Sequence, residues 1–290
     1  MKIFVITKRT GIMLALVVFL AFSLVYIGKS DVLPVSGEKR DLPIYCVQKA
    51  EDDKVVAMSF DAAWGNEDTG QLIEIMNKYN VKTTFFVVGG WVDKFPESVK
   101  QLSDAGHEIM NHSDTHPHMT KLSTEKMKEE VQNCDEKIEK ITGVKPNLFR
   151  APYGDYNNAV VGAMRDTGHF TIQWDVDSLD WKNLTASEIS DRVLKKVKPG
   201  SIILFHNAAK HTPEALPSII ESLQKDGYKI IPVSQLIYKE NFTVDNAGMQ
   251  IPNATPKADA KTENPDKPES KPNPDSTSKQ TSAPSLIPVE

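Results

Sequence analysis

Two histidines, His112 and His116, lie four residues apart in the segment NHSDTHPHM. On a helical turn this spacing places both imidazoles on one face, which is a geometry suited to a divalent ion such as Zn²⁺. The pair directly follows an apolar run typical of a β-strand, and this favours the metal interpretation. His118 lies close enough to be mistaken for a ligand. A histidine pair is weak evidence alone, so the prediction depends on which other residues lie nearby.

A carboxylate and a third histidine end two other apolar runs. Asp61 ends VVAMSF, where it could act as a general base or a metal ligand, or could form a turn or cap a helix. His206 closes SIILFH. As a general acid it needs an orienting carboxylate, and the segment WDVDSLDW offers Asp175, Asp177 and Asp180. The alternative for His206 is a core histidine bonded to a backbone carbonyl.

The elements that must position these side chains alternate between residues 55 and 237. Short apolar, β-branched runs predict strands at 55–60, 83–88, 108–111, 147–150, 170–176, 201–205 and 229–233. Amphipathic stretches predict helices at 69–79, 97–105, 124–141, 158–167, 186–197 and 213–225. Seven such strand–helix units indicate a parallel sheet, either closed as a barrel or doubly wound. Periodicity does not distinguish these two arrangements.

The polar residues are concentrated at one end of the expected strands. Asp61, His112, Arg150, Asp177 and His206 all fall at or just beyond the carboxyl ends of different strands. Barrel enzymes build their active sites from residues at this end. Random surface polarity would not concentrate them there, so the pattern favours a single site.

The ordered segments SFDAAWG, HSDTH, RAPYG, DSLDW and LFH resemble the five motifs of the polysaccharide deacetylases (carbohydrate esterase family 4, the NodB-homology domain). The resemblance covers about residues 52–240, with matching order, spacing and strand placement. The segments LPIYCV and FDAAWG are most similar to the PdaB-like, sporulation-associated branch. The resemblance implies a distorted (β/α)7 barrel that removes N-acetyl groups from a cell-envelope polysaccharide, foremost peptidoglycan, with a bound divalent metal.

The resemblance also implies roles for individual residues. Asp61 matches the catalytic base and Arg150 the residue that orients it. His206 matches the general acid, and Asp180 the carboxylate that tunes this histidine. Three further residues match substrate contacts, and two match the metal ligands. The substrate contacts are Tyr153, Trp181 and Leu204, and the ligands are His112 and His116, for zinc or alternatively cobalt or nickel.

One position departs from the family pattern. The family motif usually has two adjacent aspartates, the second of which is a metal ligand, but this chain has Ala62 there. Asp61, Glu67 or Asp68 could move into the metal shell, water could fill the gap, or the metal could be lost; we expect Asp68 to cap the following helix. The leading interpretation is a glycan N-deacetylase. The alternatives are a catalytically silent glycan-binding or morphogenetic barrel, and an enzyme acting on acetyl esters or soluble oligosaccharides.

The N-terminal region predicts a membrane anchor. Residues 11–27 form an uncharged apolar run, preceded by Lys2, Lys8 and Arg9. A helix of that run spans roughly 25 Å, near the lower limit for crossing a bilayer. The basic flank places residues 1–10 in the cytoplasm and everything beyond the anchor at 11–28 outside. The alternative is a cleaved signal peptide, which would release a secreted protein, although Gly28-Lys29-Ser30 matches a cleavage site poorly.

The composition of the rest of the chain predicts its domain bounds, the state of its cysteines and its partners. A linker at 29–51 leads into the deacetylase-like domain at 52–240, and the Pro-, Lys-, Asp- and Ser-rich residues 245–290 predict a disordered tail. The two cysteines, Cys46 and Cys134, are expected to be unpaired apolar residues. A formal net charge of −5 argues against nucleic acid as a partner. The expected partners are therefore an N-acetylated glycan and, through the anchor, the membrane.

Overall fold

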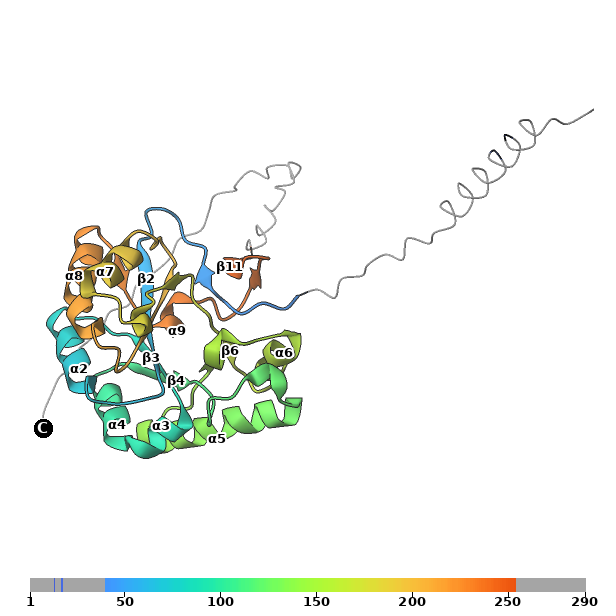
Figure 1. The fold of residues 1–290 in the computed structure, drawn as a ribbon, viewed down its shortest axis with the longest axis horizontal. Coiled ribbons are helices and arrows are strands. Elements are labelled where there is room, and N and C mark those ends of the chain that lie inside the picture. Colours follow the sequence, from blue (N-terminus) through green and yellow to red (C-terminus); the bar gives the residue numbers. More distant parts are fainter. Residues whose placement is uncertain (1–12, 14–16, 18–39, 254–290) are drawn as a thin grey trace, which may run out of the picture. The chain divides into compact units, whose positions relative to one another are not determined.

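The structure, a computed structural model, describes Met13, Val17 and residues 40–253 of the chain. A parallel sheet forms the centre of residues 40–253 (Figure 1). Its hydrogen-bonded order is β6-β5-β4-β3-β2-β8-β7, and β9 also pairs with β2. These strands are β2 (Val55–Ala62), β3 (Thr84–Val87), β4 (Glu108–Asn111), β5 (Leu148–Phe149), β6 (Phe170–Thr171), β7 (Val176–Asp177), β8 (Ile202–His206) and β9 (Lys229–Ile230).

The sheet is an open half-barrel: the parallel α/β sheet of the expected distorted (β/α)7 barrel is present, and among the described residues its two ends are not joined. Within residues 40–253, no ladder joins the two end strands β6 and β7. The strand expected at 170–176 is divided into these two short strands. Asp175 lies between them, and its carboxylate accepts hydrogen bonds from the Ile202 backbone and the Ser201 hydroxyl. Ile44 forms a parallel bridge with Ile172 instead.

Helices cover the outer face of the sheet (Figure 1). The six expected helices are present within a few residues of their predicted ends: α2 (Thr69–Lys78), α4 (Pro96–Asp104), α5 (Thr124–Thr142), α6 (Asn158–Asp166), α7 (Ala186–Leu194) and α8 (Thr212–Lys225). The short α3 (Gly89–Lys94) and α9 (Val233–Leu236) were not expected. Short 3₁₀ turns are η1 (Met119–Lys121), η2 (Pro152–Gly154) and η3 (Asp180–Lys182). Helix α5 begins at a Ser123 side-chain cap and ends at Gly143, whose φ of 73° is the left-handed value expected there.

Successive side chains of β2 point alternately into the hydrophobic core and into the inside of the half-barrel. Val56, Met58 and Phe60 are buried in the main hydrophobic cluster with side chains of α2 and α8. Successive side chains of a strand point to opposite faces. Ser59 and Asp61 are therefore on the other face, inside the curve of the half-barrel. The apolar positions thus fix which side chains are presented to the site.

Both ends of residues 40–253 meet in a second, three-stranded sheet of order β1-β11-β10. Its strands are β1 (Cys46–Val47), β10 (Phe242–Val244) and β11 (Met249–Pro252). Residues 245–252 were expected to be disordered, and this expectation is corrected. The amide of Gln250, a fully buried residue, bonds both the backbone N–H and the carbonyl of Tyr238, which ties this segment to the domain.

Other sequence predictions have different outcomes. Both cysteines are buried and free, as expected. The tail from residue 254 lies outside the described residues, and so does the predicted anchor apart from Met13 and Val17. Among the described residues, no helix combines the length and apolar character needed to span a membrane.

Candidate active site

A cavity of about 520 Å³ lies at the carboxyl ends of the strands. Its lining combines acids, histidines and aromatic side chains: Asp61, Ala63, Trp64, His112, His116, Tyr153, Gly154, Trp174, Asp177, Trp181, Leu204, His206 and Asn207. Nine residues were assigned a catalytic, substrate-binding or metal-binding role from the sequence, and seven of them are in this lining. The other two, Arg150 and Asp180, are buried behind it and bond to lining residues. The structure therefore brings the whole predicted set together.

Asp61 is held by a buried arginine. Its Oδ1 accepts a hydrogen bond of 2.7 Å from Nη1 of Arg150. Burial raises the pKa of Asp61, but the charges of Arg150, His112 and His206 outweigh burial and hold this pKa below its usual value. Asp61 is therefore ionised near neutral pH, as a general base must be.

Arg150 is anchored on several sides. Its Nη2 donates to the Ser59 hydroxyl at 2.9 Å and to the Gln173 carbonyl at 3.2 Å. Its guanidinium carbon lies 4.1 Å from the centre of the Phe86 ring. The side chain is fully buried, which makes the Asp61 carboxylate the counter-ion it requires. Removing either partner would leave an uncompensated buried charge.

His206 lies beside Asp61 and is oriented by Asp180. The two site residues are register partners on the paired strands β2 and β8. Nδ1 of His206 is 2.7 Å from Oδ1 of Asp180, whose Oδ2 also accepts from the His206 backbone and the Thr212 hydroxyl. Burial lowers the pKa of His206, but bonding to Asp180 outweighs burial and raises this pKa above its usual value. Of the three candidate carboxylates in WDVDSLDW, Asp180 is the one that contacts His206.

The two candidate metal-binding histidines lie in a loop, so the expectation of a helical turn was wrong. Ser113 and His116 have φ values of 68° and 59°, in the left-handed region. The Ser113 hydroxyl accepts from the His116 backbone N–H at 3.0 Å. The imidazole centres of His112 and His116 are 5.0 Å apart as a result. The loop thus achieves the proximity that a helix would have given.

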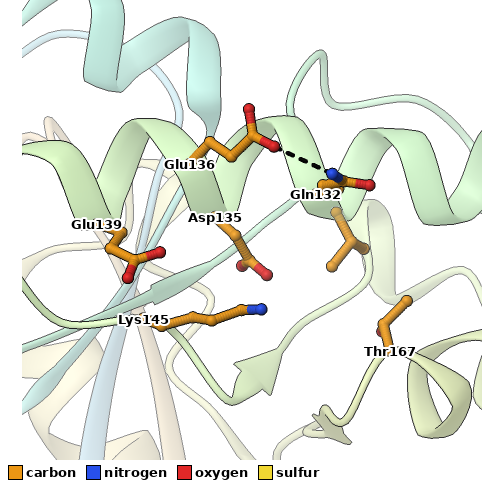
Figure 2. Close-up of a pocket in the computed structure, with 7 residues that line it drawn as sticks. Gln132, Asp135, Glu136, Glu139, Lys145 and Thr167 are labelled. Atoms are coloured by element: carbon orange, nitrogen blue, oxygen red, sulfur yellow. Dashed lines mark hydrogen bonds between the residues drawn. The ribbon is translucent and has the colours of Figure 1, made fainter.

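Helix α5 holds this loop through polar contacts. The Glu130 carboxylate accepts from the backbone N–H groups of Asp114 and Thr115. The Asn111 amide donates to Asp135 at 2.7 Å and accepts from the Ser113 backbone at 2.8 Å. Figure 2 shows Asp135 on α5, in a separate hollow of about 450 Å³. The loop that carries both histidines is therefore positioned by α5.

The histidine pair fits a divalent metal in part. Burial lowers the pKa of both imidazoles, that of His116 to about 4, so they are neutral donors at pH 7. Nδ1 of His112 is 2.8 Å from the Arg150 carbonyl, leaving its Nε2 3.6 Å from Oδ2 of Asp61. Among the described residues, no cluster of three or more His, Cys, Asp or Glu side chains is arranged to hold a metal ion. The site offers two imidazoles and lacks a complete three-ligand set.

The structure also shows the surroundings of position 62, where the family usually has a metal-binding aspartate, and of the two nearby acids. Ala62 is fully buried in the main hydrophobic cluster, whereas Ala63 lines the cavity. Asp68 precedes α2, but its side chain makes no cap hydrogen bond. Its Oδ2 accepts from the Ala208 backbone instead, so its expected role as a helix cap was wrong. Glu67 accepts from the neighbouring Asn66 backbone.

Three large aromatic side chains on the rim of the cavity are exposed. Trp64, Tyr153 and Trp181 expose 66%, 60% and 56% of their area. The Tyr153 ring lies between those of His116 and His118, with centroids 4.5 and 4.4 Å away. Aromatic faces at a cavity mouth suit an amphipathic ligand such as a sugar ring.

Sequence reasoning missed several members of the site. Trp64, Trp174 and Asn207 all line the cavity, and none was singled out. Trp64 and Asn207 lie just after the predicted ends of two strands. This position could have identified them as candidate site residues. Trp174 lies in the interruption between β6 and β7, so its position depends on the strand break that periodicity did not reveal.

The arrangement can perform acid–base hydrolysis. It places a carboxylate with a lowered pKa and a histidine with a raised pKa on neighbouring strands, at one cavity. Such a pair can remove a proton from water and return a proton to a leaving group. Two neutral imidazoles lie beside the carboxylate and could help to hold a Lewis acid.

Comparisons with known proteins agree with this geometry. A family model described as polysaccharide deacetylase matches residues 48–172. The chain is 32% identical over 194 residues to the peptidoglycan-N-acetylmuramic acid deacetylase PdaA of Bacillus subtilis (strain 168), covering 66% of this chain and 74% of PdaA. It is also 37% identical over 196 residues to YlxY of the same organism, an uncharacterized protein. That match covers 67% of this chain and 60% of YlxY, so the chain spans less than two thirds of YlxY.

The solved structures include a protein described as a pseudoenzyme. BA3943 of Bacillus anthracis, a CE4 family pseudoenzyme, matches with 36% identity and a TM-score of 0.64, covering 67% of this chain and 68% of BA3943. A BA3943 mutant described as having restored enzymatic activity matches with 38% identity and the same TM-score, covering 67% of this chain and 70% of the mutant. The half-barrel of this chain is therefore similar to the fold of BA3943.

Proposed function

We propose that this chain, which belongs to the polysaccharide deacetylase family, hydrolyses N-acetyl groups on a cell-envelope glycan. One observation carries the proposal: Asp61 and His206 line one cavity, each with its own buried partner. Arg150 keeps the base ionised, and Asp180 keeps the acid protonated. These opposite protonation states are what amide hydrolysis needs at a single pH.

The residues divide the reaction between them. Asp61 removes a proton from the attacking water, whose oxygen forms a bond to the acetyl carbon. His206 then donates its proton to the amide nitrogen as the C–N bond breaks, which releases acetate and a free amine. We assign Leu204 and Trp181 to the walls of the acetyl pocket, and the Tyr153 backbone N–H to the oxyanion.

We propose His112 and His116 as the residues that hold a divalent metal, with zinc favoured over cobalt or nickel. Such an ion supplies Lewis-acid activation of water and of the carbonyl. Their low pKa keeps both imidazoles able to coordinate at neutral pH. Because the described residues offer no third ligand, we expect weaker metal binding than at sites with three protein ligands.

The finer parts of the proposal concern substrate and location. We propose peptidoglycan as the glycan, because PdaA is described as acting on it. Descriptions of the relatives name both N-acetylmuramic acid and N-acetylglucosamine, so either sugar fits the family. An extracytoplasmic position behind the N-terminal anchor, and a PdaB-like role in sporulation, are proposals from the sequence alone.

A second candidate is a catalytically silent glycan-binding barrel. Ala62 at the usual ligand position favours it, and so does the similarity to BA3943, which is described as a pseudoenzyme. The cavity and its aromatic rim would serve either function. Catalysis therefore has to be tested together with metal content.

The test measures bound metal and acetate release on the purified chain, with peptidoglycan and chitooligosaccharides as substrates. We expect metal in the native chain, and loss of both metal and acetate release in His112→Ala. His118→Ala is the matched control, because His118 lies nearby and does not line the cavity. No acetate from any of these glycans, even with added Zn²⁺ or Co²⁺, would refute the deacetylase and leave the silent barrel.

A further inference from the structure

A buried acid and a buried histidine lie in contact outside the catalytic cavity. Asp135 and His169 expose only 4% and 5% of their area, and His169 Nε2 lies 3.2 Å from Oδ2 of Asp135. The other ring nitrogen, Nδ1, lies 3.0 Å from the Thr167 hydroxyl. A carboxylate accepts hydrogen bonds and does not donate them, so His169 Nε2 is the donor to Asp135. Figure 2 shows Asp135 extending from α5 into the hollow that Thr167 also lines.

Asp135 also determines which way the Asn111 side-chain amide faces. The amide nitrogen of Asn111 donates to Asp135 at 2.7 Å and to the Val131 carbonyl at 2.8 Å, and both of these partners only accept. The amide oxygen faces the other way and accepts from the Ser113 backbone N–H at 2.8 Å. Asn111 and Ser113 are fully buried, so a reversed amide would leave buried polar groups without partners, which is costly.

Ser113 transmits this orientation to the two candidate metal-binding histidines. Its backbone φ of 68° lies in the left-handed region, which a residue other than glycine keeps only when its contacts hold it there. Its hydroxyl accepts from the His116 backbone N–H at 3.0 Å. The conformation of Ser113 therefore sets where the His116 imidazole lies relative to that of His112, 5.0 Å away between ring centres.

We propose that Asp135 is a positioning residue for His112 and His116, and that His169 holds the Asp135 carboxylate in the orientation that this requires. The carboxylate acts through Asn111 and Ser113. Partners of this kind, one step behind metal-binding imidazoles, commonly change metal affinity when they are replaced. The inference rests on the proposed metal-binding function of the two histidines and adds the residues that control their geometry.

The first test follows the loop in the metal-free chain, so its result does not depend on activity. Hydrogen exchange of the Ser113 and His116 backbone N–H groups is measured by NMR in the native chain and in Asp135→Asn. Asparagine has nearly the same shape as aspartate, but it can place a donor against the Asn111 amide. We expect exchange at these two N–H groups to become roughly fivefold faster, and exchange along α5 to stay unchanged.

A second variant and a control separate positioning from a general loss of stability. His169→Phe keeps an aromatic ring and removes the donor to Asp135, so it should accelerate exchange at the same two N–H groups by a smaller factor. Glu136→Gln is the matched control, because Glu136 lies next to Asp135 on α5 and lines the same hollow but is exposed. Its exchange rates should equal those of the native chain.

The second test measures Zn²⁺ binding by competition with a chelator. We expect Asp135→Asn to raise the dissociation constant of Zn²⁺ roughly tenfold, because the two imidazoles no longer keep their relative position. Glu136→Gln should leave this constant unchanged. The free chain and the zinc-bound chain thus report on the same positioning through different measurements.

Several outcomes would overturn the inference. Unchanged exchange at Ser113 and His116 in both Asp135→Asn and His169→Phe is one, and equal acceleration throughout α5 is another, since Asp135 would then only stabilise the helix. An unchanged Zn²⁺ affinity in a chain that binds Zn²⁺ is a third. If Asp135→Asn does not fold, His169→Phe decides alone. Faster exchange confined to the loop, in a chain that releases no acetate, would refute the deacetylase and leave the positioning role standing.

Discussion

At the scale of single residues, the contact between His206 and Asp180 sets the proton state of the proposed acid. Asp180 raises the pKa of His206 by accepting from Nδ1 at 2.7 Å. The Thr212 hydroxyl and the His206 backbone hold the second carboxylate oxygen, which fixes the direction of the first. A neutral replacement keeps the shape of this contact and removes its charge.

We predict that Asp180→Asn lowers the pKa of His206. His206 then loses its proton at a lower pH, so the alkaline limit of deacetylation moves toward acid. The His206 pKa is followed by NMR of the imidazole, which works whether or not the chain is active, and the activity limit by the pH dependence of kcat/KM. Asp177→Asn is the graded control, since Asp177 raises the same pKa only through its charge. An unchanged His206 pKa in Asp180→Asn would contradict the assignment.

At the scale of elements, hydrophobic periodicity located the six longer helices well. Each has an apolar face that must be buried, and this face is visible in the sequence. The histidine loop was mistaken for a helical turn, because residues four apart are neighbours on a helix. The structure reaches the same proximity through left-handed residues at Ser113 and His116. The loop that contains these residues is held by Glu130 and Asp135, which lie on the following helix α5. A local sequence pattern does not reveal such contacts.

Ala62 lies at the end of β2, in the position where the family usually has a metal-binding aspartate. We predict that Ala62→Asp lowers the stability of the metal-free chain, because residue 62 is fully buried among apolar side chains. The family pattern predicts that this carboxylate joins the two histidines, so added Zn²⁺ should raise the Tm more than in the native chain. Melting curves with and without Zn²⁺ measure both effects. Ala62→Asn controls for the shape of the side chain without its charge. Equal zinc stabilisation of all three proteins would show that residue 62 does not supply a ligand.

At the scale of the whole molecule, the sequence predicted the parallel sheet and the end of it that carries the site. Asp61, Arg150 and His206 follow apolar strands, and parallel strands place their carboxyl ends together. The gap between β6 and β7 goes with the break at residues 172–175, where Ile172 forms a bridge with Ile44 and the Asp175 carboxylate accepts from the Ile202 backbone of β8. The strand β11 was also missed. Both features are pairings between distant segments, which composition and periodicity do not encode.

The opposite end of the sheet makes the fold sensitive to acid. His107 precedes β4 and is buried, and its Nδ1 accepts from the Thr83 backbone at 3.2 Å. Burial, with the charge of Lys82, lowers the pKa of His107 from 6.5 to about 4. Between these values the unfolded chain binds the proton and the folded chain does not. Stability is therefore lost as the pH falls from 6.5 toward 4, by about 3 kcal/mol in total.

We predict that His107→Asn reduces this loss. Asparagine keeps an acceptor near the position of Nδ1 but does not titrate, so the variant should be less stable at pH 7 and lose less stability on acidification. Urea midpoints between pH 7 and pH 4.5 measure the difference. His118→Asn, which replaces a half-exposed histidine, is the control for the substitution itself. His112 and His116 also have lowered pKa values and should leave part of the acid sensitivity in His107→Asn. If the midpoints of His107→Asn fall as steeply as those of the native chain, His107 is not a source of that sensitivity.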